Sequence, residues 1–385
     1  MKRILFIAII LGGCSSLMPL QRSKLITAFH LIEDKKYEEA KEFIEGMVED
    51  EHAAQWPRTW HARGLLYQNA YREGMEKNNR RLYELKPRQL FVAYESYERA
   101  LSLDAGSGIR NQLAPKYILL ANDFQTMGQN RFRDKRYAEA MEAFVTVEKI
   151  RQGELLNLDT DTSLVYNIAM AAINDRQNDK AIQYLHRLDG YKYSTNVSHL
   201  LHLEYLQQGD TLEAKKVLER GIEKYDDNES LILLLVDLHF AQGNVEQSLD
   251  ILEQKSELYP STYKIPYTKG LILQKSGKFN EAIAAYEESL ALETKEAIIY
   301  AQIATCYYNI GVEIEENART IDLNSLVAME RKHSTVALES ALNWLNKALE
   351  LESSDTDALA IIHELSALLE ITERVESING VPLEN

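Results

Sequence analysis

Cysteine is nearly absent from this sequence, and its scarcity limits the chemistry that the chain can carry. Only Cys14 and Cys306 occur among 385 residues, which excludes a disulfide framework and a zinc site built from several thiolates. Proline is also scarce, with seven residues, and no low-complexity tract interrupts the chain. Because 45% of the residues are hydrophobic, a folded core is within reach.

Positive charge is in short supply as well. The chain carries 43 lysines and arginines against 59 aspartates and glutamates, a formal net charge of −16. Binding a phosphate backbone requires a basic surface, so we expect no nucleic-acid partner. An acidic protein of this kind is better suited to basic or neutral protein surfaces.

A long apolar run is missing too. The N-terminal run from Ile4 to Leu11 has eight residues and follows Lys2 and Arg3. A membrane-spanning helix needs about 20 apolar residues, so this run is too short to span. Charge followed by a short apolar run is typical of a secretory signal.

The residues that end this run, Leu11 to Cys14, resemble the lipobox of bacterial lipoproteins. The resemblance implies a signal peptide over residues 1–13, a lipid on Cys14 and a linker over residues 14–20. The other interpretation is a cysteine that lies near a cleavage site by chance. Removing the signal takes two cations away, which leaves a net charge of −18.

Ser15 follows the cysteine, where the inner-membrane retention signal usually has aspartate. The resemblance therefore implies the outer membrane of a bacterium. Residues 15–24 lack an acidic cluster like the surface-export signal of some lipoproteins, which favours the periplasmic face.

Glycine is uncommon but regularly placed. Gly209, Gly243, Gly277 and Gly311 are each 34 residues apart. Each follows an apolar stretch and precedes an amphipathic one, so we expect each to end a helix in a left-handed conformation. A fixed period of this length indicates a repeated helix-turn-helix unit.

The repeat resembles the tetratricopeptide repeat (TPR), which has a small residue in its first helix, alanine early in its second and a large apolar residue four positions later. The clearest copy covers residues 263–295. The second-helix position is occupied in turn by Ala40, Ala93, Ala140, Ala181, Ala214, Ser248, Ala282 and Ala341. The position four residues later holds Ile44, Tyr97, Phe144, Leu185, Leu218, Leu252, Tyr286 and Leu345.

This resemblance implies an all-α fold, a right-handed α-solenoid of about eight stacked TPR units over residues 21–375. One unit cannot bury its own apolar face, so neighbours stack into a continuous core. Residues 356–375 look like a closing helix that caps the stack, and residues 376–385 like a flexible tail.

Two insertions interrupt the register, near residues 69–89 and 312–336. The first has six basic and three acidic residues in an otherwise acidic chain. Both fall between the two helices of one repeat, so we expect them to lengthen these helices into hairpins. Each is either a solvated extension or a docking element, since exposed connections often carry function.

The family's groove is formed by the first helices, and its positions can be placed on this sequence. Two interpretations stay open: these side chains bind an extended or helical peptide, or they pack between adjacent repeats. We find no carboxylate clamp of the chaperone-binding kind. The candidate groove residues are Tyr166, Met170, His199, Leu203, Leu233, Asp237, Phe240, Tyr267, Thr305 and Tyr308.

Little else points to chemistry. His199 and His202 have the spacing of metal ligands on one helix face, with Glu204 nearby, but His202 falls at the small-residue position that faces the partner helix. Cys306 lies within a first helix, where a free thiol usually packs. We expect no catalytic residue, cofactor or metal.

The leading interpretation is a lipid-anchored, non-catalytic scaffold for envelope proteins or peptides in an assembly or secretion complex. One rival is a glycan- or peptide-binding lipoprotein for nutrient uptake. The other is an enzyme with its site in an insertion, which would use His199 or His333.

Overall fold

The protein is all-helical throughout the part that the computed structural model describes, which is residues 14–351 without 105, 107, 293–294 and 321–323; residues 14–21, 324–325 and 328 are described by their backbone alone. It divides into two compact units, one ending at Tyr193 and one beginning at Ser194. The predicted signal peptide 1–13, closing helix 356–375 and tail 376–385 lie outside the described residues.

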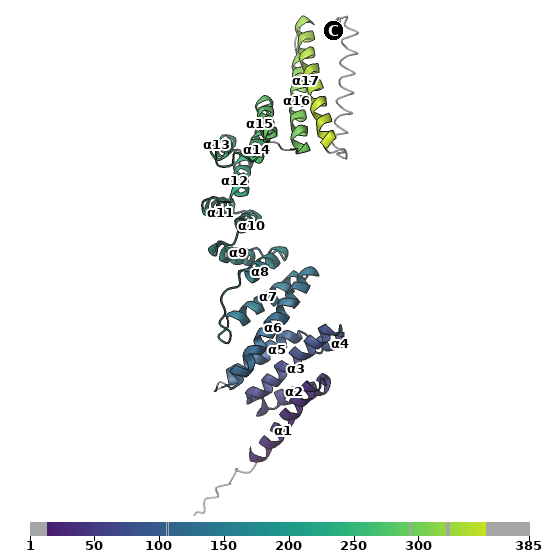
Figure 1. The fold of residues 1–385 in the computed structure, drawn as a ribbon, viewed down its shortest axis with the longest axis vertical. Coiled ribbons are helices and arrows are strands. Elements are labelled where there is room, and N and C mark those ends of the chain that lie inside the picture. Colours follow the sequence, from purple (N-terminus) through teal and green to yellow (C-terminus); the bar gives the residue numbers. More distant parts are fainter. Residues whose placement is uncertain (1–13, 105, 107, 293–294, 321–323, 352–385) are drawn as a thin grey trace, which may run out of the picture. The chain divides into compact units, whose positions relative to one another are not determined.

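The first unit contains four helix pairs, which can be followed in Figure 1. They are α1 with α2, α3 with α5, α6 with α7, and α8 with α9. The helices are α1 (Cys14–Glu33), α2 (Tyr37–Glu49), η1 (Ala53–Gln55), α3 (Pro57–Glu76), α4 (Arg80–Tyr83), α5 (Gln89–Leu103), α6 (Gly108–Arg133), α7 (Tyr137–Gln152), α8 (Thr162–Asn174) and α9 (Asn178–Gly190).

The second unit contains four more pairs of consecutive helices. They are α10 (Thr195–Gln207), α11 (Thr211–Lys224), α12 (Glu229–Ala241), α13 (Val245–Ser256), α14 (Lys264–Lys275), α15 (Phe279–Ala291), α16 (Ala297–Ala318) and α17 (Asn324–Leu351). The predicted number of about eight repeats is therefore confirmed. None of the described helices is both long enough and apolar enough to cross a bilayer.

Helix α1 begins earlier than expected. Residues 14–20, where we placed a linker, already belong to it. They contain no glycine, and Leu17, Met18 and Leu20 are good helix formers, so the helix continues in spite of Pro19, which lies near its start and lacks a backbone donor.

The repeat register is visible as burial. Each of the eight second-helix residues from Ala40 to Ala341, Ser248 included, is fully buried, and each of the eight large residues four positions later is at most 2% exposed. The two positions are one turn apart and face the first helix of the same pair. This pattern gives each pair its own hydrophobic interface, which the neighbouring pairs extend.

Close approach between paired helices depends on glycine in three repeats. A Cβ added at Gly64 would lie 2.2 Å from the ring of Tyr97, and at Gly270 it would lie 2.5 Å from that of Tyr286. Gly128 meets Phe144 in the same way. The aromatic ring of the second helix therefore occupies the space that a side chain on the first would fill.

The turn between paired helices uses a left-handed residue five positions before the buried small residue. Gly209, Gly243 and Gly277 have φ of 77°, 82° and 76°, as expected. Lysine or arginine takes the same place in earlier repeats. These residues are Lys35, Arg88, Lys135 and Arg176, with φ of 62°, 55°, 60° and 58°.

The prediction for Gly311 is wrong. Helix α16 continues through this residue to Ala318. Gly311 is buried, and a Cβ there would lie 2.8 Å from a Leu338 methyl group and 3.3 Å from the Ser334 carbonyl oxygen. The 34-residue period thus ends in a helix contact rather than in a turn, because the insertion lengthens the helix.

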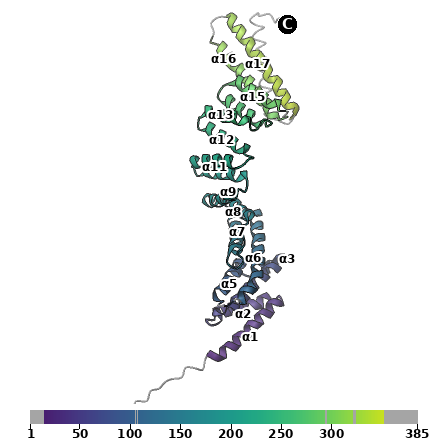
Figure 2. The same ribbon diagram turned by 60° about the vertical axis from the view of Figure 1, so that its left-hand side comes forward.

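The insertion near residues 312–336 lengthens both helices of the last described pair. Helices α16 and α17 have 22 and 28 residues and lie side by side in Figure 1 and Figure 2. The insertion near residues 69–89 lengthens only α3 and then forms the four-residue helix α4.

Candidate functional site

The candidate groove residues are spread over the first helices of five repeats. Tyr166 and Met170 belong to α8 in the first unit. The second unit carries His199 and Leu203 on α10, Leu233, Asp237 and Phe240 on α12, Tyr267 on α14, and Thr305 and Tyr308 on α16. All are half-buried or exposed.

These side chains divide their surface between packing and solvent. Leu233 and Phe240 pack against a buried cluster that includes Val236 and Ile265, which belong to α12 and α14. The ring of Tyr267 lies 5.8 Å from that of Tyr286. Each residue therefore helps to join neighbouring helices and still leaves part of its surface accessible.

Charge on this face gathers near α12 and α14. The Lys275 ammonium lies 5.7 Å from the Phe240 ring centroid, within reach of a cation–π contact. Burial raises the pKa of the Asp237 carboxyl, and Lys275 partly opposes that rise. In the first unit, Tyr166 stacks on Tyr193 with ring centroids 5.5 Å apart, so one face of Tyr166 is already covered.

A hollow of about 580 Å³ lies on the first-helix side of the first unit, between α1, the start of α3 and the start of α6. We call it the N-terminal hollow. Its lining includes Arg22, Leu25, Ile26, Trp56, Arg58 and Ile109. Leu25 and Ile109 are buried, whereas Ile26 is 59% exposed. The hollow therefore has an apolar floor and an accessible apolar rim.

The charges of this hollow are unbalanced. Arg22 and Arg58 are both exposed, and neither forms an ion pair with any described residue. The carboxylate of Asp104 also lines the hollow, but one of its oxygens accepts a hydrogen bond of 2.9 Å from the Ile109 backbone N–H at the start of α6. That carboxylate is engaged as a helix cap.

Trp56 lies at the junction of η1 and α3, half-buried on the core. Its indole N–H has no hydrogen-bond partner within the described chain, unlike Trp60, which donates to the Ala54 carbonyl at 2.8 Å. Tryptophan and arginine are both enriched in interaction hot spots, and here a tryptophan with an unused hydrogen-bond donor lies beside arginine.

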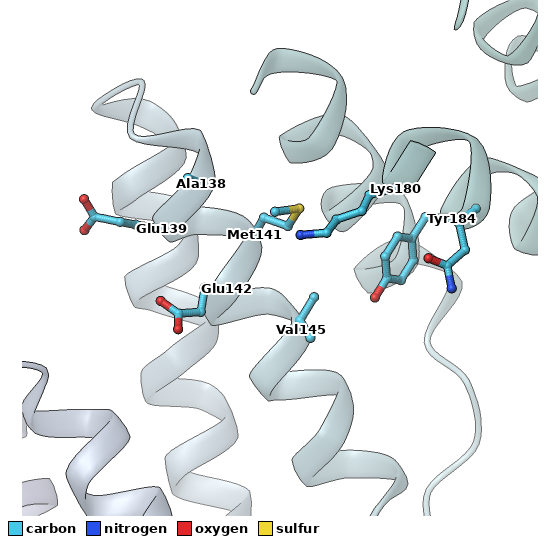
Figure 3. A pocket seen from close by; sticks show the side chains of 8 residues that line it. Ala138, Glu139, Met141, Glu142, Val145, Lys180 and Tyr184 are labelled. Carbon is cyan, nitrogen blue, oxygen red and sulfur yellow. The ribbon is translucent and has the colours of Figure 1, made fainter. Parts of the chain in front are cut away.

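A second hollow, of about 460 Å³, lies between the second helices α7 and α9 (Figure 3). Lys180 extends from α9 toward Met141 of α7 in this view. Carboxylates of Glu139 and Glu142 stand at its other edge, and both pair with arginines elsewhere.

The insertion near residues 69–89 borders a third hollow, of about 740 Å³. We expected this insertion to be either a solvated extension or a docking element. The structure adds that its cations form ion pairs while most of them stay exposed, Arg80 and Arg81 at 78%. All six are paired with carboxylates of the protein, three of them on α2 and α7. The pairs are Arg72–Asp123, Lys77–Glu73, Arg80–Glu84, Arg81–Glu38, Lys86–Glu45 and Arg88–Glu142.

Of the two histidines considered as metal ligands, His202 has a packing role. His202 is 3% exposed, and its Nδ1 lies 3.1 Å from the Ala214 carbonyl oxygen of the partner helix. Burial lowers its pKa. No cluster of three metal-ligating side chains occurs among the residues that the structure describes. Burial also raises the pKa of the Cys306 thiol to about 12, which suits a packing role.

The N-terminal hollow was not among the sites predicted from the sequence. The predicted groove positions began at Tyr166, because the insertions break the period in the earlier repeats. The missing signal was a set of cations without acidic neighbours near the starts of three first helices, Arg22, Arg58 and Lys116 among them.

Comparison with known families supports the repeat. Residues 205–261 and 264–296 match family models described as tetratricopeptide repeat. These segments are TPRs. The matches support the TPR family and a protein-interaction function for the chain.

Relatives among curated proteins match only part of this chain. BBSome complex member BBS4 of Bos taurus is 20% identical over 49% of this chain and 35% of its own length. Coatomer subunit epsilon-2 of Oryza sativa subsp. indica is 31% identical over 28% of this chain and 36% of its own. The chain thus spans about a third of the length of these relatives.

A solved TPR repeats protein from Bacteroides fragilis NCTC 9343 is 17% identical. The match covers 64% of this chain and 98% of that protein, with a TM-score of 0.33.

Proposed function

We propose that this protein is a membrane-anchored, non-catalytic scaffold that binds other envelope proteins or peptides. The helix pairs carry the proposal, four in each of the two units. In each pair, the second helix contributes the buried small and large residues, and part of the first helix stays accessible to solvent. Within each unit, the accessible faces of successive first helices offer a surface for an extended partner.

The anchor in this proposal is a lipid on Cys14, and the site of action is the periplasmic face of a bacterial outer membrane. The lipobox-like end of the N-terminal apolar run supports the anchor, and Ser15 supports the outer membrane. Several acyl chains on one residue are enough for stable attachment.

The rival functions find less support. A glycan-binding lipoprotein would need a ligand lobe outside the repeats, whereas the described parts of both insertions are helix extensions and the short helix α4. An enzyme would need a cluster of reacting groups, whereas His199 and His333 lie on separate helices, and His333 is 4.0 Å from Glu330 of its own helix.

Site-directed photocrosslinking in the native cells tests the scaffold. Photoreactive residues at Tyr166, Tyr267 and Tyr308 should capture a discrete envelope protein, because these side chains are accessible on first helices. The same probe at Glu219, exposed on the second helix α11, is the matched control. Equal capture at Glu219, or a cross-linked glycan at the tyrosines, would contradict the proposal.

A further inference from the structure

The N-terminal hollow carries charge that the protein itself does not use. The chain has an excess of acidic residues, and the six cations of the insertion are all paired with carboxylates. Arg22 and Arg58 remain without an ion pair in the described chain, on two different helices that line one concave site. Such a pair of cations is positioned to bind an anion from another molecule.

From this hollow we infer that the protein binds an acidic peptide segment of a partner protein. Carboxylates of the segment pair with Arg22 and Arg58, and an apolar side chain between them packs on Trp56 and Ile26. The inference rests on the proposed scaffold function and names the chemistry of its partner. The groove residues of the later repeats are not needed for it.

The shape and lining suit a peptide. A volume of about 580 Å³ holds a few side chains. Leu25 and Ile109 form a dry floor, while the exposed Ile26 and the half-buried Trp56 offer apolar contact at the rim. Burying an apolar side chain there would strengthen the adjacent ion pairs, because water is displaced from around them.

The local charge favours an anion over any other ligand. Asp104 is the one carboxylate that lines the hollow, and it is hydrogen-bonded to the α6 backbone. With Arg22 and Arg58 against one engaged carboxylate, the hollow is positive within an acidic protein, so it attracts acidic segments.

An anionic membrane surface is the competing source of negative charge. A bilayer is broad and flat, whereas Arg22 and Arg58 line a hollow whose floor is apolar. A peptide side chain can reach that floor, and a layer of headgroups cannot. The observations favour the peptide, and the membrane becomes an outcome of the test.

Fluorescence anisotropy with the full chain in detergent tests the inference. The probe is a short labelled peptide of glutamates with leucine at every third position, and the reference probe has glutamine in place of glutamate. The double variant Arg22→Glu and Arg58→Glu should weaken binding by about 10-fold or more, since each change replaces attraction by repulsion. Arg99→Glu, exposed on the second helix α5, makes the same type of charge change and should alter binding by less than about 3-fold.

A spectroscopic measurement locates the peptide. The protein has three tryptophans, so labelling with 5-fluorotryptophan gives a small set of ¹⁹F resonances. The resonance assigned with Trp56→Phe should shift on adding the acidic peptide, and that of Trp60, whose N–H is already bonded, should shift less. The glutamine peptide should leave both unchanged.

Three results would overturn the inference. The first is equal binding of the glutamate and glutamine peptides, and the second is unchanged binding of the glutamate peptide by the double variant. The third is that the protein binds neither peptide, while the double variant loses binding to phosphatidylglycerol vesicles as compared with phosphatidylcholine vesicles. The scaffold proposal would survive each of them if photocrosslinking at Tyr166, Tyr267 or Tyr308 still captured a protein, so the two failures are distinguishable.

Discussion

His61 is a buried base with no hydrogen-bond partner for either ring nitrogen among the described residues. It is 6% exposed and contacts aromatic rings, with Phe29 and Tyr97 at 5.9 and 6.3 Å between centroids. Burial and, to a smaller extent, the nearby charges of Lys116 and Arg58 together lower its pKa to about 4. The folded protein therefore holds this imidazole neutral.

This residue should make the protein sensitive to acid. Between pH 6.5 and about 4 the unfolded chain binds a proton at His61 and the folded chain does not, so the free energy of unfolding falls as pH falls through this window. The loss is on the order of 3 kcal/mol, from about 1.4 kcal/mol per pKa unit. Urea unfolding of wild type and His61→Phe across this range should show a shallower decline in the variant.

His52→Gln is the control for that measurement, since His52 is exposed at the start of η1. It should keep the wild-type pH dependence. Parallel curves for wild type and His61→Phe would mean that His61 is solvated or protonated in the folded state.

At the scale of the element, the helix pair is held by a fit between a glycine and a ring. Gly270 on α14 faces Tyr286 on α15, whose hydroxyl donates to the Gln274 side chain. The sequence showed both positions as family residues. Only the packed helix pair shows that the glycine leaves space for the aromatic ring of its own repeat.

Gly270→Ala should destabilise the second unit by about 1 to 3 kcal/mol, because its Cβ overlaps the Tyr286 ring. Tyr286→Leu frees that space, so the double variant should lose less stability than the sum of the single ones, with a coupling of about 0.5 to 3 kcal/mol. Chemical denaturation of the four proteins completes the cycle.

Gly190→Ala provides the matched substitution, because no atom lies within 4 Å of the added Cβ at the end of α9. It should be neutral or stabilising by up to about 1 kcal/mol, from helix propensity. Strict additivity in the Gly270 cycle would indicate that α14 and α15 separate enough to accept both side chains.

The insertion near residues 69–89 shows what the element scale adds to composition. Its six cations suggested a surface function, yet each has an acidic partner, on α2, α3, α6 or α7 or, for Arg80, at Glu84 just after α4. Half-exposed ion pairs contribute little stability each. Together they define where the insertion folds back against the acidic helices.

At the scale of the whole molecule, the proposed anchor decides where the scaffold works. Cys14→Ser should abolish incorporation of labelled palmitate and move the protein from the membrane fraction to the soluble fraction, because lipid supplies the attachment. Cys306→Ser is the control, since Cys306 is buried in α16. It should keep both label and membrane fraction.

Two outcomes would remove the anchor from the proposal. One is palmitate that persists in Cys14→Ser, and the other is a wild-type protein that carries no lipid. Photocrosslinking with the wild type would then still report on the scaffold.

The sequence by itself determined the fold class, the number of repeats and the buried positions, from Ala40 to Leu345. These follow from local spacing, because small and large residues one turn apart can only face the neighbouring helix. The turn glycines Gly209, Gly243 and Gly277 follow from spacing for the same reason.

Tertiary structure alone decided what residues far apart in the chain do together. Gly311 packs against Leu338 rather than ending a helix, and three of the six cations of the insertion pair with carboxylates on α2 and α7. The N-terminal hollow joins Arg22 and Arg58 across α1 and α3. Each outcome depends on which helices are neighbours in space. The pattern along one helix shows which of its residues share a face, but not which charges of other helices lie against that face.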